Sequence, residues 1–436
     1  MITDSKNNTT SNKTYKRSIS LPRGTLDLTY KINPSAAQND SQKDDNYQLE
    51  DLLGFAQRIN PKRAFLFVSK VLGRHIPVAP STMRSAFTDL ANLVPSNLPE
   101  PILVIGMAET AVGLSAGVHQ ALQTRYPNAL LLNSTRHAQH NDDNSETLLT
   151  TFSEDHSHAS QHLIYQSSDK ITQAQLLASK TLIMVDDEAS TGNTCVNVVT
   201  ALRNAGLSQL EQVHLTTLVD WSLSQNQGTA DVDDAISARL PNIEFYRHHL
   251  LSGAWQWTDA PNPEPIIMPS VDTTDAGSQS LGNTGNWGRF PTLDSTDGFY
   301  NYLQKFQAAL TSFSDQAPFD KEQLPERILV LGSNEFVWLP FLLAEWLEGQ
   351  VQDSEATTTV NFSALTRSPI ALGGAITTML SFSDNYGLGM TNFAYNVEPS
   401  DWDLIVLCVE TSSDSVDDMW QGLDNVLVIG TSHGNG

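Results

Sequence analysis

The chain has 436 residues, with 25 basic and 49 acidic side chains and a formal net charge of -24. This length allows two or three domains, each with its own hydrophobic core. The acidic balance argues against a nucleic-acid partner, because a phosphodiester backbone would be repelled unless the basic residues were tightly clustered. The two cysteines, Cys195 and Cys408, are too few for a disulfide framework and lack metal-ligand spacing, which fits a reducing cytoplasm.

The sequence has no run of about 18 apolar residues that could span a bilayer, and its first residues lack the apolar core of a secretion signal. We therefore expect a cytoplasmic protein with no membrane partner. Residues 1–45 are rich in Asn, Ser, Thr, Lys and Asp, and they offer too little apolar area to offset the entropy of ordering. They are predicted to form a disordered tail.

Residues 46–94 are predicted to form two helices around the turn-forming Asn60-Pro61 and the apolar run AFLFV. Basic side chains are crowded in this stretch of an otherwise acidic chain. They are Arg58, Lys62, Arg63, Lys70 and Arg74. Either they form a solvated face, or they line a surface that faces an anion.

Apolar runs typical of strands in a parallel sheet follow at four places, which are 101–106, 129–133, 181–185 and 213–221. Helical or longer connecting stretches separate them. Strands that alternate with helices indicate an α/β fold with a mainly parallel sheet. Ligands of such sheets bind outside the carboxyl ends of the strands. This first domain is predicted to span residues 46–257.

Residues 258–292 are dense in Pro, Gly, Asp, Ser and Thr, a composition that favours an interdomain linker. A second α/β domain is predicted for residues 293–436. It contains the strand RILVLG at 327–332 and the strand DLIVLCVE at 403–410.

The stretch TLIMVDDEASTGNT, residues 181–194, carries the clearest chemical signal. Its strand places Asp186 and Asp187 at the edge of the sheet. The Ser, Thr and Asn residues that follow offer N–H groups and hydroxyls at a helix N-terminus, and such an N-terminus favours a phosphate. Gly192 permits the positive φ or close approach that such a cradle needs. Carboxylates beside a phosphate cradle suit the hydroxyls of a diol and a hydrated divalent cation. A ligand with both groups is a ribose 5-phosphate.

This stretch resembles the phosphoribosyl pyrophosphate signature of type I phosphoribosyltransferases, which has four apolar residues, two acids and a T/S-G-x-T loop between a strand and a helix. The resemblance implies a type I fold with a flexible hood, Mg²⁺ as cofactor, and phosphoribosyl pyrophosphate and a small acceptor as substrates. It implies that Asp186 and Asp187 hold the ribose hydroxyls and help to hold the metal indirectly, through those hydroxyls or water. The implied 5-phosphate loop consists of Ser190, Thr191, Gly192, Asn193 and Thr194. Ser190 stands where many family members carry an acid or threonine, which leaves the general base open.

The family also has a pyrophosphate loop after its first strand, and GMAETAVG at 106–113 stands in that place. The resemblance implies that backbone donors of this loop stabilise the leaving group. The implied residues are Met107, Ala108, Glu109 and Thr110. An ordinary turn between a strand and a helix, capped by Thr110, would have the same pattern.

Residues 134–180 are too long for a plain connection, and type I enzymes carry there a flexible hood that excludes water from the reacting centre. Arg136, His156 and His158 are candidates for pyrophosphate or substrate contacts in it. Together with Asp186 and Asp187 they make up the predicted catalytic residues. The histidine-rich HSHASQH is alternatively a metal site, or only a polar loop.

The second half of the chain repeats the first. PEPILVIGMAE at 99–109 aligns with PERILVLGSNE at 325–335, and TLIMVDDEAS at 181–190 aligns with DLIVLCVETS at 403–412. Between these matches, STR at 134–136 meets LTRSP at 365–369, and 151–165 aligns with 381–395 without a gap. Because the order is preserved, the chain from about residue 320 is predicted to be a degenerate copy of the first α/β unit.

In the predicted copy, Cys408 and Val409 replace the acidic pair, and Asp414 replaces the loop glycine. The copy is therefore not expected to bind phosphoribosyl pyrophosphate in the usual way. LTRSPI also resembles the signature of the TRSP domain, which lies C-terminal to an orotate-phosphoribosyltransferase-like group encoded in tellurite-resistance-associated gene clusters and proposed to make a nucleoside-like metabolite. Arg367 in this signature is a candidate to bind an anionic substrate end, although a structural turn with an arginine cap explains it equally well.

These patterns predict a Mg²⁺-dependent phosphoribosyltransferase that moves ribose 5-phosphate between phosphoribosyl pyrophosphate and an unidentified base-like acceptor. Type I enzymes are commonly dimers, so a homodimer is a candidate assembly. A non-catalytic regulator that keeps the site as a sensor is the alternative, because Ser190 supplies no acid. A phosphoribohydrolase or phosphorylase that acts on a nucleotide is a third hypothesis.

Overall fold

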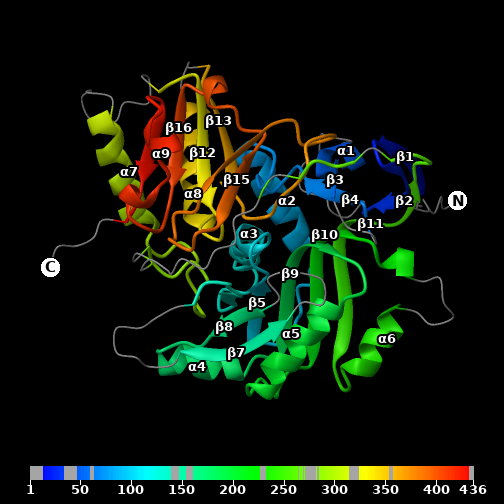
Figure 1. Cartoon of the computed structure of the whole chain (residues 1–436). Helices are drawn as coiled ribbons and strands as arrows, with labels where there is room; N and C mark the ends of the chain where they lie inside the picture. The colour runs from blue at the N-terminus through cyan, green and yellow to red at the C-terminus, as the bar shows by residue number, and fades with distance from the viewer. Residues whose placement is uncertain are drawn as a thin grey trace, which may run out of the picture.

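The computed structural model describes most of the chain. The described residues are 13–33, 47–58, 63–138, 147–153, 161–225, 232–263, 265–268, 270, 281, 284–313, 324–352 and 357–431. Two α/β units follow each other along the chain. In Figure 1 the second unit, coloured yellow to red, lies above the green sheet of the first.

The first unit is built on a seven-stranded sheet of order β1-β2-β11-β10-β9-β5-β6. The last five strands of this order are parallel, and β1 and β2 are antiparallel to their neighbours. The strands are β1 (Tyr15–Leu21), β2 (Gly24–Ile32), β5 (Ile102–Gly106), β6 (Leu130–Asn133), β9 (Thr181–Ala189), β10 (Gln212–Asp220) and β11 (Glu244–Asp259). The helices are α1 (Leu49–Leu52), α2 (Pro80–Asn92), α3 (Val112–Leu122), α4 (Lys170–Leu177), α5 (Asn193–Asn204) and α6 (Val232–Arg239), with a 3₁₀ turn at Ser222–Gln225. The α/β fold with a mainly parallel sheet is therefore confirmed.

The prediction of a disordered tail over residues 1–45 is wrong for the part that the structure describes. The strands β1 and β2 form an antiparallel hairpin, and β2 pairs along the second half of the long strand β11. The cause is the alternation in GTLDLTYKI, which buries Leu26 and Leu28 on one face while polar side chains take the other. An average composition hides this alternation. Residues 1–12 and 34–46 lie outside the described residues.

The first of the two helices predicted for residues 46–94 is also wrong, whereas the second is α2. A single short turn, α1, leads into the hairpin β3 (Leu53–Gln57) and β4 (Phe65–Ser69). Aromatic packing explains this outcome, since Phe67 stacks on Trp221 with ring centroids 4.5 Å apart and Phe65 meets Trp255 edge-on at 5.0 Å. Aromatic side chains favour such a pleated, half-buried surface.

The linker predicted for residues 258–292 is wrong at both of its ends. Strand β11 continues to Asp259, and residues 284–292, here called the joining segment, pack against the first unit. Leu131 of β6 and Thr292 exchange two backbone hydrogen bonds of 2.8 and 3.0 Å. The Trp287 indole is buried. The joining segment is therefore part of the folded structure.

The second unit carries a four-stranded parallel sheet of order β13-β12-β16-β17. Its strands are β12 (Arg327–Ser333), β13 (Thr359–Leu365), β16 (Leu404–Cys408) and β17 (Val426–Ile429), with the hairpin β14 (Met379–Ser383) and β15 (Thr391–Tyr395). Its helices are α7 (Phe299–Phe313), α8 (Trp338–Gln352) and α9 (Asp418–Gln421), with 3₁₀ turns at Pro399–Asp401 and Ser413–Ser415.

The topology bears out the internal repeat. The order β13-β12-β16-β17 corresponds to β6-β5-β9-β10 of the first unit, and the hairpin β14-β15 corresponds to β7 (Leu148–Ser153) and β8 (Gln161–Tyr165). Even the bridges to these hairpins correspond: Thr135 pairs with Leu163 in the first unit, and Thr366 pairs with Phe393 in the second. The aligned residues thus occupy equivalent places.

The two units share a hydrophobic core. Helix α8 of the second unit packs against both α2 and α3 of the first, and α3 is seen between the two sheets in Figure 1. Phe87 on α2 lies 5.4 Å, centroid to centroid, from Phe341 on α8. No helix among the described residues is long and apolar enough to cross a membrane.

Candidate active site

Strands β5 and β6 of the first unit end at the same level, and the neighbouring β9 runs four residues farther, to Ala189. Gly106 at the end of β5 is paired with Val185 on β9 and with Asn133 on β6. The chain after each strand therefore emerges at one carboxyl edge of the sheet, where α/β folds bind ligands. A Cβ at Gly106 would lie 2.1 Å from Ser115 Oγ, so only glycine lets these strand ends approach α3.

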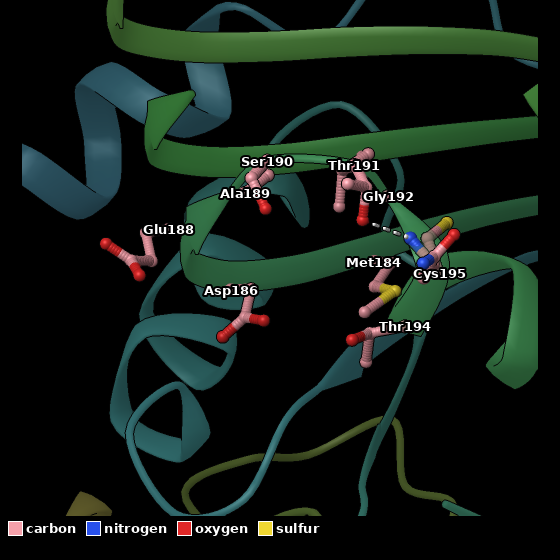
Figure 2. A pocket seen from close by; sticks show the side chains of 11 residues that line it. Met184, Asp186, Glu188, Ala189, Ser190, Thr191, Gly192, Thr194 and Cys195 are labelled. Carbon is pink, nitrogen blue, oxygen red and sulfur yellow. Dashed lines mark hydrogen bonds between the residues drawn. The ribbon is translucent and has the colours of Figure 1, made fainter. Parts of the chain in front are cut away.

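A cavity of about 160 Å³ opens at the end of β9. Figure 2 shows the side chains around it. Its lining residues are Met184, Asp186, Glu188 to Cys195 and Leu215. Helix α5 begins directly after Gly192, which has a left-handed φ of 76°. The first N–H groups of a helix have no partner within the helix, and its N-terminal end carries the positive end of the helix dipole, so the start of α5 suits an anion.

Strand alternation decides which acidic side chains reach this cavity. Strand β9 continues to Ala189, beyond the end at Val185 that the apolar run predicts. Asp186 and Glu188 line the cavity, and Asp187 between them is not among the lining residues. Burial, followed by the charge of Glu188, raises the pKa of Asp187 above its ordinary value. Sequence reasoning missed Glu188, although alternation with Asp186 could have indicated it.

Arginines surround the loop that forms this cavity. Arg63 binds Glu188 with both ends of its guanidinium, at 2.5 and 3.0 Å. Behind the loop, Arg247 forms a 2.9 Å ion pair with the buried Asp220, and a Cβ on Gly192 would lie 3.2 Å from Arg247 Nη2. Arg239 on α6 donates to Asn193 Oδ1 at 2.6 Å. Of these, only Arg63 belonged to the basic cluster seen in the sequence.

The predicted pyrophosphate loop, residues 107–110, follows β5, which pairs with β9, and contacts the second unit through Glu109. Met107 and Ala108 are buried, and the Ala108 N–H donates to Ser134 Oγ at 3.0 Å. The peptide bond between Ala108 and Glu109 is cis. The loop thus connects the end of β5 to the chain that follows β6.

The Glu109 side chain points to arginines rather than to an open cavity. Its carboxylate binds Arg74 at 2.8 Å and Arg367 of the second unit at 2.7 and 3.1 Å. Burial alone would raise the pKa of Glu109, but Arg367, then Arg74 and Arg136, outweigh burial and lower that pKa to about 2. Because Glu109 remains an anion, its side chain cannot itself attract pyrophosphate.

The structure describes part of the predicted hood. Arg136 donates its backbone N–H to Glu335 of the second unit at 2.7 Å, and His162 lies 2.9 Å from Ser134 Oγ through Nδ1. Strand β7 lies against α5, where Asn197 donates to the Ser153 carbonyl at 3.1 Å. His156 and His158 lie outside the described residues.

Family comparison agrees with this geometry. Residues 52–247 match a family described as phosphoribosyl transferase, and residues 288–427 match the TRSP domain found C-terminal to it. The chain therefore contains a domain of this phosphoribosyltransferase family. The first unit is its phosphoribosyltransferase domain, and the second unit is its TRSP domain. No curated protein sequence matches the chain.

Solved structures similar to part of the chain include adenine phosphoribosyltransferases. The enzyme from Trypanosoma brucei, in complex with AMP, pyrophosphate and ribose-5-phosphate, is 14% identical with a TM-score of 0.32, covering 46% of this chain and 76% of that chain. The enzyme from Leishmania tarentolae is 13% identical with a TM-score of 0.32, covering 47% and 85%. The enzyme from Giardia lamblia with 9-deazaadenine is 11% identical with a TM-score of 0.29, covering 46% and 96%.

The equivalent edge of the TRSP domain is filled by protein side chains. Cys408, aligned with Asp186, is buried, and burial raises the pKa of its thiol to about 12. Glu410, aligned with Glu188, is buried between Arg289 of the joining segment and Tyr386, whose hydroxyl donates at 3.0 Å. These contacts occupy the place that corresponds to the cavity of the phosphoribosyltransferase domain.

Proposed function

We propose that the protein transfers ribose 5-phosphate between phosphoribosyl pyrophosphate and a small base-like acceptor, with Mg²⁺ as cofactor. The observation that carries this proposal is the cavity after β9, which is lined by the carboxylates of Asp186 and Glu188, by the left-handed Gly192 and by the start of α5. Carboxylates accept hydrogen bonds from a diol, and a helix N-terminus binds phosphate. The two groups together suit ribose 5-phosphate, which carries both a vicinal diol and a phosphate.

The proposed binding mode assigns one task to each loop at this edge. Residues 190–194 hold the 5-phosphate. Asp186 accepts from the ribose hydroxyls, assisted by Glu188 on the same face of β9 and not by Asp187, which does not line the cavity. Residues 107–110 receive the pyrophosphate through backbone donors. Catalysis then depends on holding both groups in place and on stabilising the charge that develops as the bond to C1 breaks.

The carboxylates present fit the usual magnesium chemistry. No cluster of three or more His, Cys, Asp or Glu side chains within the described ranges is arranged to hold a metal ion. Mg²⁺ is commonly held by one or two carboxylates together with substrate phosphates, so Asp186 and Glu188 would hold it together with the substrate. When bound, Mg²⁺ would neutralise charge on the leaving pyrophosphate.

Titration calorimetry of the full chain with phosphoribosyl pyrophosphate, with and without Mg²⁺, tests the site. We expect binding that strengthens with Mg²⁺. Pyrophosphate release with a panel of purine and pyrimidine bases then tests transfer. Absence of binding in both conditions overturns the proposal, and binding without turnover of any acceptor supports a sensor instead. Ribose 5-phosphate released with water as the only acceptor indicates hydrolysis.

A further inference from the structure

Aligned residues of the two domains form contacts across the interface between them. Glu109 and Glu335 are aligned after the central strands β5 and β12, and Arg136 and Arg367 are aligned after β6 and β13. Glu109 binds the Arg367 guanidinium at 2.7 and 3.1 Å. In return, Glu335 accepts from the Arg136 backbone N–H at 2.7 Å and from the Thr135 hydroxyl at 2.5 Å. In each domain, a glutamate thus binds the threonine-arginine turn of the other domain.

This exchange brings together three arginines and two glutamates. The positive charges of Arg74, Arg136 and Arg367 lower the pKa of Glu109. The negative charge of Glu335 acts to raise the pKa of both Arg74 and Arg367. Arg74 and Arg367 share the single carboxylate of Glu109, at 2.8 and 2.7 Å. The side chains of Arg74 and Arg367 are 5% and 14% exposed. Two arginines that are largely removed from water and share one carboxylate are stabilised by a further anion.

This pair of arginines lies at the loop proposed to receive pyrophosphate. Glu109 belongs to that loop, and Ser134, which binds the loop at Ala108, immediately precedes Thr135 and Arg136. Arg367 uses Nε and Nη2 for Glu109, while its Nη1 meets the Met390 sulfur at 3.7 Å. A thioether is a weak acceptor, and a phosphate oxygen would displace it readily.

We propose that the TRSP domain acts as a built-in second subunit, which completes the pyrophosphate subsite of the phosphoribosyltransferase domain by supplying Arg367. This inference rests on the proposed function. In this role the TRSP domain contributes to the site of the other domain and does not need a ribose site of its own. Glu109 holds Arg367 in place across the domain interface, and Arg367 offers its remaining N–H groups to the pyrophosphate.

Variants of the full chain at Arg367 test this proposal, with Arg84 as a matched control. Arg84 also crosses the interface, binding Glu345 on α8 at 2.6 and 2.8 Å, but it lies outside the loop. Pyrophosphate, ribose 5-phosphate and phosphoribosyl pyrophosphate are each titrated with Mg²⁺ into wild type, Arg367→Gln, Arg367→Lys and Arg84→Gln. Melting temperatures are measured in parallel to identify variants that do not fold.

We expect Arg367→Gln to weaken binding of pyrophosphate and of phosphoribosyl pyrophosphate about tenfold or more, the loss of one charge-assisted contact. Ribose 5-phosphate should bind as in wild type. Arg367→Lys keeps the charge but loses the fork geometry, so its loss should be smaller. If Arg367→Gln does not fold, Arg367→Lys carries the test. Arg84→Gln should bind all three ligands normally.

Unchanged pyrophosphate affinity in folded Arg367 variants overturns the inference and leaves Arg367 as a structural contact. An equal loss in Arg84→Gln also overturns it, because the effect would then come from the interface as a whole. These results differ from a failure of the proposed function, in which wild type itself binds neither ribose 5-phosphate nor phosphoribosyl pyrophosphate.

Discussion

The phosphoribosyltransferase domain and the TRSP domain share four strands in the same order and the same bridged hairpin, yet their carboxyl edges differ. In the first, Asp186 and Glu188 border an open cavity. In the second, the residue equivalent to Glu188 is buried under Arg289 and Tyr386. The comparison shows that one fold can keep its core and lose its chemistry through a few residues at one edge.

The largest effect should come from Glu410→Gln in the TRSP domain. This change leaves the buried Arg289 without its counter-charge, and breaking a buried pair commonly costs about 3–5 kcal/mol of unfolding free energy. Urea unfolding measures the loss, and phosphoribosyl pyrophosphate affinity below the transition should be unchanged. Asp403→Asn, which breaks the exposed pair with Arg327 in the same domain, should leave stability nearly unchanged. Similar stability losses in both variants would contradict this reading of the filled edge.

Asp186→Asn should weaken binding of phosphoribosyl pyrophosphate about 100-fold, about 2.7 kcal/mol, because the ribose hydroxyls lose a charged acceptor. Calorimetric titration measures the change. The matched control is Cys408→Ser, at the aligned position of the TRSP domain, which should leave affinity as in wild type. Normal affinity in Asp186→Asn would mean that the ribose site lies elsewhere.

Gly192→Ala should lower stability by about 1–2 kcal/mol and affinity for phosphoribosyl pyrophosphate about tenfold. The left-handed φ of 76° is costly for a residue with a Cβ, so the phosphate loop shifts. Thermal unfolding and titration measure the two effects. Gly349→Ala in α8 meets no atom within 4 Å and should instead add about 0.5–1 kcal/mol of stability without changing affinity. Equal destabilisation by both changes would argue against a special backbone at Gly192.

The smallest effect is expected for Asp187→Asn. Burial and Glu188 raise the pKa of Asp187 in the folded state, so the wild type loses stability as pH rises above the ordinary aspartate range near about 4. The variant lacks this loss and should be more stable than wild type by about 1 kcal/mol at pH 7.5. The difference should vanish toward pH 4. Urea unfolding at both pH values checks it, and a difference independent of pH would exclude titration as the cause.

The parts of the fold predicted from sequence are those with local signals. The apolar runs at β5 and β9 and the glycine-containing start of α5 are visible in a few consecutive residues. The β1-β2 hairpin is not, because its order depends on pairing with β11, more than 200 residues away in the chain. Composition alone therefore predicted a tail.

In the candidate site, too, the residues with a local sequence signal could be predicted and the contacts between distant residues could not. Asp186 and the loop around Gly192 follow from one motif, whereas the partners of Glu109 come from elsewhere in the chain. Arg74 is 35 residues away and Arg367 is 258 residues away. The repeat did place Glu109 opposite Glu335 and Arg136 opposite Arg367, but an alignment of two halves cannot show that they exchange contacts.

The joining segment has a consequence for association between chains. In the seven-stranded sheet β6 is one edge and β1 is the other, and an open edge can pair with a strand of another molecule. The two backbone hydrogen bonds between Leu131 and Thr292 cover β6. Strand β1 has mostly exposed side chains, and it carries Lys16 and Arg17, the kind of charged residues that discourage strand pairing. The same segment that supplies Arg289 to the second sheet thus protects the first sheet from aggregation.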